Sequence, residues 1–281
     1  RQRQAEGAGA TAQQAQADFE NTRLVLTAEL AADYLVLRQT DAEIDVLQQT
    51  LAAQTKALDF ISARHELGAA SGLDLNQQQG LTAATQTQLT LLQDQRARYQ
   101  NAIATLVGVP APDFKLPVNL AVTTVPAIPL TAPAALLERR PDIAAAERAM
   151  AAANAQIGVA RSAYFPSLGL SGLYGSDANQ LSNLFSAPAL LWSIGVSATQ
   201  TIFDGGRTGA NVDFAKAGYQ QALGNYRQSV LVAMQEVQDG LNSEVALTQA
   251  IASAKVAADS ADRSLGLSTD RYQSGITTNL E

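Results

Sequence analysis

The sequence contains two copies of one long unit, offset by the 207 positions that separate Arg64 from Arg271. Residues 64–68 and 271–275 share one pattern, since both begin with arginine and end with glycine. The same offset aligns further pairs well away from these pentapeptides: Ala15 with Ala222, Phe19 with Tyr226, Glu29 with Glu236 and Leu73 with Leu280. A repeat of this length constrains the fold strongly, because both copies must form the same structural unit.

The composition favours long helices packed through small side chains over a single thick globular core. Hydrophobic residues make up 47% of the 281, but aromatic residues only 5%, and good helix formers such as Ala, Gln and Leu are abundant. The net charge of −7 argues against a nucleic-acid partner, which needs a basic face. With no cysteine in the chain, disulfides and thiolate metal sites are excluded.

Residues 1–109 contain no proline and predict a hairpin of two long helices. The first helix is expected over about residues 10–66, which at 1.5 Å per residue is roughly 85 Å long. Gly68 and Gly72 end it, and a second helix is expected from about residue 73 to residue 106. Two long helices joined by a short glycine turn form an antiparallel pair.

An apolar stripe on the first helix predicts that this pair is a coiled coil. Its members alternate in steps of three and four: Leu37, Ile44, Leu47, Leu51, Leu58 and Ile61. Three polar residues interrupt the same register: Thr40, Gln54 and His65. His65 is the one histidine of the chain, and a lone histidine on a helix is more often solvated than a metal ligand.

Residues 110–133 contain six prolines among β-branched residues. They predict extended connecting structure, in which a short strand can form. Residues 134–165 follow as helix, first a short one to residue 139 and then a longer one to about Tyr164. Pro141 suits the first turn of that longer helix, and Asp142 suits its positive end.

Residues 166–204 carry the only clear strand pattern, with apolar residues alternating with small or polar ones. On the second strand the apolar face is expected to consist of Trp192, Ile194, Val196 and Ala198. Such alternation places one face in an apolar medium and one in a polar medium. Strands of about ten residues can cross a bilayer when tilted, but a hairpin resting on a soluble core gives the same pattern.

Residues 205–281 lack proline and predict the long helix of the second copy, with its turn at Gly275. The glycines of the segment FDGGR, residues 203–207, are expected to redirect the chain from strand to helix. A phosphate-binding loop is disfavoured there, because the lysine and the Ser/Thr of that motif are missing. No nucleophile, base and orienting group recur together, so the sequence predicts no catalytic site, no metal and no cofactor.

Three motifs in this order resemble the TolC family of outer-membrane efflux proteins, in particular the outer-membrane factors of resistance-nodulation-division pumps. They are LERRPDI at residues 137–143, ARSAYFPSL at 160–168 and FDGGR at 203–207, and the turn at Arg271 completes the set. The resemblance covers essentially the whole chain. It implies a homotrimer in which long helices form a periplasmic α-barrel and each protomer gives four strands to a twelve-stranded outer-membrane β-barrel.

On this resemblance the chain is mainly α with a membrane β-hairpin. Residues 1–109 become a periplasmic hairpin, 110–133 an equatorial segment, 134–165 the return to the membrane, 166–204 a barrel hairpin, and 205–281 the second periplasmic helix with the start of its tip. The lipid-facing residues would be Leu168, Leu170, Trp192, Ile194 and Val196. Because the chain starts at Arg1 without an initiator methionine or signal peptide, we expect it to be an internal fragment.

The two glycine turns would be the periplasmic tips that touch the adaptor protein. Matching the family's short tip motif, without its valine, are Leu67, Gly68 and Ala69 in the first copy and Ser274, Gly275 and Ile276 in the second. The family holds its entrance shut with a tyrosine and an acid, and Tyr272 and Asp74 match those positions. Glu281 matches a second acidic position. Ordinary helix capping is the alternative role for these residues.

The resemblance implies a passive exit duct for small molecules in the bacterial outer membrane, with most of this chain in the periplasm. Its partners would be a periplasmic adaptor, an inner-membrane pump and outer-membrane lipid, with no nucleic acid. Two alternatives stay open. One is a periplasmic adaptor or scaffold built on a coiled-coil hairpin, and the other is a soluble enzyme with a coiled-coil insertion. The repeat and the alternating strands argue against the first, and the missing catalytic constellation argues against the second.

Overall fold

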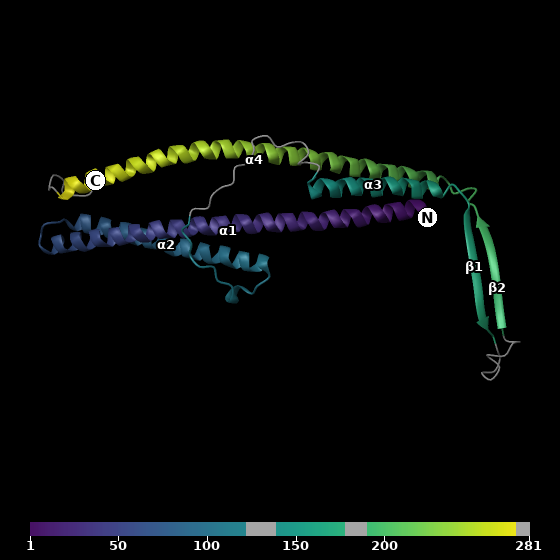
Figure 1. Cartoon of the computed structure of the whole chain (residues 1–281), viewed down its shortest axis with the longest axis horizontal. Helices are drawn as coiled ribbons and strands as arrows, with labels where there is room; N and C mark the ends of the chain where they lie inside the picture. The colour runs from purple at the N-terminus through teal and green to yellow at the C-terminus, as the bar shows by residue number, and fades with distance from the viewer. Residues whose placement is uncertain (122–138, 178–189, 274–281) are drawn as a thin grey trace. The chain divides into compact units, whose positions relative to one another are not determined.

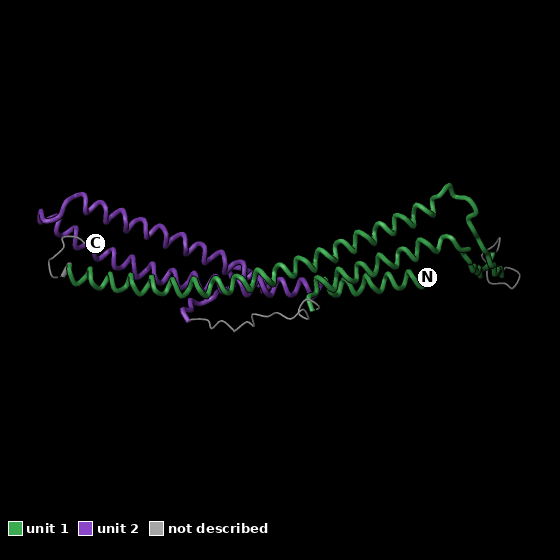
Figure 2. Tube along the Cα trace, turned by 90° about the horizontal axis from the view of Figure 1, so that it is seen from above, with its two compact units in different colours: residues 1–18, 129–281 green, residues 19–128 purple. Residues whose placement is uncertain are grey.

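The computed structural model describes residues 1–121, 139–177 and 190–273. Its elements are α1 (Gln2–Glu66), α2 (Gly72–Val107), the 3-10 helix η1 (Ala111–Asp113), α3 (Pro141–Ser162), β1 (Ser167–Ser176), β2 (Leu190–Thr199) and α4 (Arg207–Gln273) (Figure 1). The chain forms two compact units, residues 19–128 and residues 1–18 with 129–281 (Figure 2). The predicted class, mainly helical with one strand hairpin, is confirmed.

The two copies of the repeat each contain one very long helix, α1 with 65 residues and α4 with 67. At a rise of 1.5 Å per residue each is about 100 Å long. α1 begins eight residues earlier than predicted, and Gly7 does not break it. A Cβ at Gly7 would lie 3.4 Å from that of Ala155 on α3, so the small residue permits close packing there.

In the unit of residues 19–128, α2 runs antiparallel to α1. Gln78 Nε2 donates to the carbonyl oxygen of Gln54 at 3.1 Å near the turn, and Arg96 pairs with Asp41 farther along. Of the predicted apolar stripe only Leu37 is fully buried, and its other members are half-buried. Thr40, which interrupts the stripe, is buried too. Its hydroxyl is satisfied there because it donates to the carbonyl oxygen of Val36 on the same helix.

α2 ends where the sequence predicted, at Gly108, which adopts the left-handed conformation with φ of 79°. After η1 the chain runs without regular structure from residue 114 to residue 121, so the described part of the proline-rich segment contains no strand. Residues 122–133 of that segment lie outside the described residues. The predicted short helix at 134–139 also lies outside them, apart from Arg139.

In the other unit, α3 lies alongside the first part of α4 (Figure 1). Pro141 opens α3 as predicted, and the helix ends at Ser162, two residues earlier than expected. α3 also contacts the start of α1, since Arg148 Nη1 donates to Gln13 Oε1 at 3.2 Å. The side chain of Arg3 fills the space in which a Cβ at Gly158 would stand.

β1 and β2 form an antiparallel two-stranded sheet of ten residues per strand. Each strand has the predicted length of about ten residues, and β1 ends at Ser176, where the connection to the second strand is expected to begin. In the observed register Leu170 faces Val196 and Tyr174 faces Trp192. The expected connection between the strands falls mostly on residues 178–189, which lie outside the described residues.

The segment FDGGR redirects the chain from β2 into α4, as predicted. Gly205 and Gly206 have φ of 65° and 90°, and the Asp204 carboxylate accepts from the backbone N–H of Gly206 and of Thr208. The hydrogen bond from the Thr208 side chain, together with these backbone bonds, lowers the pKa of Asp204. The anion-binding end of α4 is therefore occupied by the chain's own carboxylate.

Candidate functional site

The turn between α1 and α2 is closed by a network of short-range hydrogen bonds. Gly68, with φ of 75°, donates its N–H to the carbonyl of His65, and Ala69 donates to the carbonyl of Arg64. This pair of bonds is a Schellman motif, which satisfies the last carbonyls of α1. The predicted tip residues Leu67, Gly68 and Ala69 thus lie together on one exposed turn.

Asp74 caps the start of α2 within this same turn. The Ser71 hydroxyl accepts from the Asp74 N–H at 3.1 Å, and Asp74 Oδ2 accepts from the Ser71 N–H at 3.3 Å. This reciprocal pair is a capping box. The capping role that the sequence left open is therefore present. A carboxylate offers about four lone-pair sites, so the cap leaves acceptor capacity for a second role.

The second tip falls largely outside the described residues. Tyr272 lies in the last turn of α4, and only its backbone is described. The predicted residues Ser274, Gly275, Ile276 and Glu281 all lie beyond residue 273. The proposed partnership of Asp74 with Tyr272 accordingly stays a prediction.

The β-hairpin has one apolar and one small, polar face. The residues predicted to face lipid share the apolar face, and each has more than half of its surface exposed: Leu168, Leu170, Trp192, Ile194 and Val196. On the opposite face glycine stands across from serine, as Gly169 does from Ser197. A Cβ at Gly169 would lie 2.7 Å from the Ser197 hydroxyl. Leu173 and Leu191 depart from the alternation, since both lie on the small, polar face.

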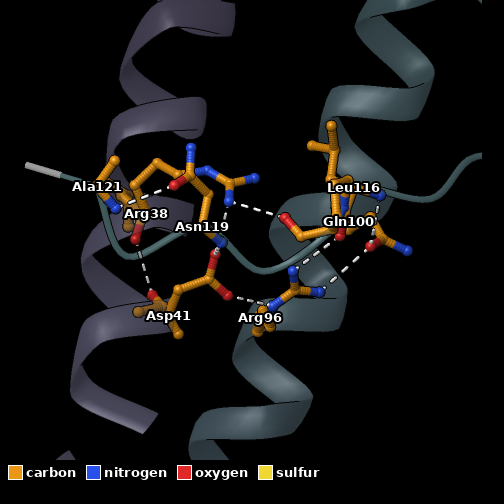
Figure 3. A network of polar contacts seen from close by, with 10 residues as sticks. Arg38, Asp41, Arg96, Gln100, Leu116, Asn119 and Ala121 are labelled. Atoms are coloured by element: carbon orange, nitrogen blue, oxygen red, sulfur yellow. Dashed lines mark hydrogen bonds and ion pairs between the residues drawn. The ribbon is translucent and has the colours of Figure 1, made fainter. Parts of the chain in front are cut away.

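A buried ionic cluster that sequence reasoning missed fastens residues 114–121 to the helical hairpin (Figure 3). Asp41 on α1, with a fully buried side chain, accepts from Arg38 at 2.8 Å and from Arg96 on α2 at 2.5 Å. The two guanidinium groups also donate to the chain, Arg38 to the carbonyl of Pro117 and Arg96 to that of Leu116, both at 2.9 Å. We call these three side chains the Asp41 cluster.

The Asp41 cluster carries two positive charges against one negative charge in a poorly hydrated place. The side chain of Arg38 is 8% exposed and that of Arg96 is 17% exposed. The backbone carbonyls of residues 116 and 117 offset the excess charge, so the cluster is complete only when this segment is in place. The spacing of Arg38 and Asp41 on the helix could have suggested an ion pair, but nothing in it signals burial.

A second ionic group, which includes the predicted Asp142, joins the motif LERRPDI to α4. Arg140 donates to Asp142 at 2.8 Å and to Glu236 at 2.7 Å. The hydrogen bond from Arg140 lowers the pKa of Asp142, against the opposing effect of partial burial. The same pairing raises the pKa of Arg140. The motif therefore anchors the first turn of α3 to the long helix beside it.

We expect the Asp142→Asn variant to lose stability in a pH-dependent way. Because the pKa of Asp142 is lower in the folded chain, its contribution is fully present above its ordinary value near 4 and is lost as the pH falls through the folded value. The difference in Tm between wild type and variant should thus be largest at neutral pH and shrink below about pH 4. A constant difference from pH 7 to pH 3 would contradict this.

No metal site emerges from the part of the chain that the structure describes. Residues 1–121, 139–177 and 190–273 contain no group of three or more His, Asp or Glu side chains placed to hold a metal ion. An open groove of about 480 Å³ runs between α3 and α4, and Phe214, which is 83% exposed, lines it. Among the described helices, none has an apolar stretch long enough to span a membrane.

Comparison with known proteins identifies the family. The sequence pattern described as "Outer membrane efflux protein" matches residues 1–109 and 132–281. The toluene efflux pump outer membrane protein TtgF of Pseudomonas putida is 34% identical over 263 residues, which are 92% of this chain and 54% of TtgF. The outer membrane protein OprJ of Pseudomonas aeruginosa is 33% identical over 270 residues, with the same shares of the two chains.

The solved structures agree with this assignment. The outer-membrane channel OprN superposes with a TM-score of 0.86 at 32% identity, covering 98% of this chain and 62% of OprN. The chain spans about half the length of the curated relatives it matches. The predicted resemblance and the predicted outer-membrane location are confirmed. The chain belongs to the outer membrane efflux protein family.

Proposed function

We propose that the protein is the outer-membrane exit channel of a tripartite efflux pump. Small molecules would pass through it unchanged, driven by an inner-membrane pump and handed over through a periplasmic adaptor. The observation that carries this proposal is a hairpin with one apolar and one small, polar face, connected directly to α4, a helix of about 100 Å. The hairpin suits the membrane section of a duct, and the long helix suits its aqueous section.

The working form would be the homotrimer that the family resemblance implies, and association is needed in any case because one hairpin leaves its edges and its apolar face uncovered. The predicted segments keep their roles in this proposal. Residues 1–109 and 205–281 form the periplasmic helices, 110–133 the equatorial segment, 134–165 the return, and 166–204 the barrel hairpin. The adaptor alternative gains no support, since both TtgF and OprJ are outer membrane proteins.

We propose no exported molecule more specific than a small molecule. The name of TtgF mentions toluene, which applies to that protein. The hairpin strands themselves contain no charged residue, so this part of the wall would not select by charge. Deleting the gene should raise retention of a fluorescent pump substrate in cells, and a plasmid copy should reverse the effect. Unchanged retention when the partner pump is active would contradict the proposal.

We further propose that Asp74 contributes to closing the periplasmic entrance, with Tyr272 as its partner and Glu281 as a second acid. Replacing Asp74 by alanine should raise single-channel conductance in planar bilayers, because a phenol–carboxylate hydrogen bond is charge-assisted and would be lost. Ser71 provides the control, since Ser71→Ala removes the other hydrogen bond of the same capping box and keeps the Asp74 carboxylate. Equal conductance of Asp74→Ala, Ser71→Ala and wild type would exclude the gating role.

A further inference from the structure

The first tip turn is held by side chains of α1 as well as by its backbone. Arg64 Nη2 donates to the carbonyl of Ala69 at 3.3 Å, and His65 Nδ1 lies 2.9 Å from the carbonyl oxygen of Ala70. These two carbonyls belong to the turn itself, and the helix ladder of α1 has already ended there. The two side-chain contacts therefore add to the backbone hydrogen bonds that close the turn.

The His65 contact fixes the proton on the ring. A carbonyl oxygen only accepts, so Nδ1 must carry the hydrogen that it donates to Ala70. This donor exists both in the Nδ1-protonated neutral ring and in the charged ring, so the contact does not require a positive charge. The ring also lies near the start of α2, because a Cβ at Gly72 would lie 3.7 Å from its Cε1.

We propose that His65 is a positioning residue that clamps the first tip in a single conformation. It stands in the last turn of α1, contacts the turn through Ala70 and lies beside the first residue of α2. The clamp holds Leu67, which is 84% exposed, at the outer side of a turn whose backbone is already ordered. This inference rests on the proposed function, in which the tip meets a periplasmic partner. A preordered apolar contact binds that partner with less loss of conformational entropy.

The second copy of the repeat supplies a natural test of the clamp. Tyr272 occupies the position equivalent to His65, and the phenol hydroxyl stands at the far end of its ring. A tyrosine therefore has no donor at the place of Nδ1. Asparagine does, because its Nδ2 lies the same number of bonds from the backbone. His65→Tyr should open the clamp, and His65→Asn should keep it.

Hydrogen–deuterium exchange of the protein in detergent, expressed from its complete reading frame, tests the clamp directly. In His65→Tyr the amides of residues 68–71 should exchange about three- to tenfold faster than in wild type, as expected for one lost hydrogen bond. In His65→Asn they should stay close to wild type. Unchanged exchange in His65→Tyr, or equally fast exchange in both variants, would overturn the proposal.

Efflux in cells separates the clamp from the proposed function. If the tip meets the partner, His65→Tyr should lower substrate export, and His65→Asn should restore it. Faster exchange with normal export would leave the clamp in place and refute the role of this tip in partner binding. Loss of export in the gene deletion but normal exchange in His65→Tyr would support the exit channel and refute the clamp.

Discussion

Replacing Asp41 by alanine is expected to lower the free energy of unfolding by about 3–5 kcal/mol. The substitution leaves Arg38 and Arg96 facing each other in a poorly hydrated site with no carboxylate between them. Removing one partner of a buried ion pair costs far more than the pair contributes, because the remaining charge stays desolvated. Chemical denaturation followed by far-UV circular dichroism measures the loss.

Asp94 offers a matched control on α2. It forms an ion pair with Arg98 at 2.8 Å, but the two side chains are 58% and 79% exposed. Asp94→Ala should therefore cost no more than about 0.5 kcal/mol. Limited proteolysis adds a local test, since residues 114–121 should become sensitive in Asp41→Ala alone. Similar losses in both variants would show that the Asp41 cluster does not hold this segment.

Placing lysine at Val196 is expected to block assembly in the outer membrane. Val196 belongs to the apolar face of the hairpin, opposite Leu170, and is 80% exposed in the isolated chain. A lysine on a lipid-facing strand position costs about 2–4 kcal/mol near the bilayer midplane. The amount of folded protein in outer-membrane fractions should fall strongly.

Ser197 is the control for this substitution, because it is the next residue of the strand and points to the other face. Ser197→Lys places the same charge at nearly the same depth, but toward the proposed aqueous interior. Membrane assembly should therefore stay near the wild-type level. If Ser197→Lys assembled poorly and Val196→Lys assembled well, the assignment of the two faces would be reversed.

The long elements of the fold could be predicted because their sequence signals are local. The absence of proline over residues 1–109 and the glycine at Gly108 predict helix and helix end directly. The start of α1 was predicted too late, because Gly7 and Gly9 suggest an unstable helix. The structure places Gly7 against α3, where packing offsets its low helix propensity.

The Asp41 cluster could not be predicted, because its burial depends on a distant part of the chain. Arg38 and Asp41 alone look like an ordinary surface pair on a helix. They are covered only because the segment with Pro117 and Asn119, which bonds to them, follows 79 and 78 positions later. The clamp at His65 was missed for a related reason. Its acceptor is a turn carbonyl, and backbone acceptors leave no mark in the sequence.

Single-channel recording tests the central claim most directly. The purified protein, expressed from its complete reading frame and assembled in planar bilayers, should give discrete and long-lived conductance steps. Under the same conditions, the Val196→Lys variant should give no such steps, and the Ser197→Lys variant should give them. Folded protein that inserts into the bilayer but gives no conductance in any of these forms would contradict an exit channel.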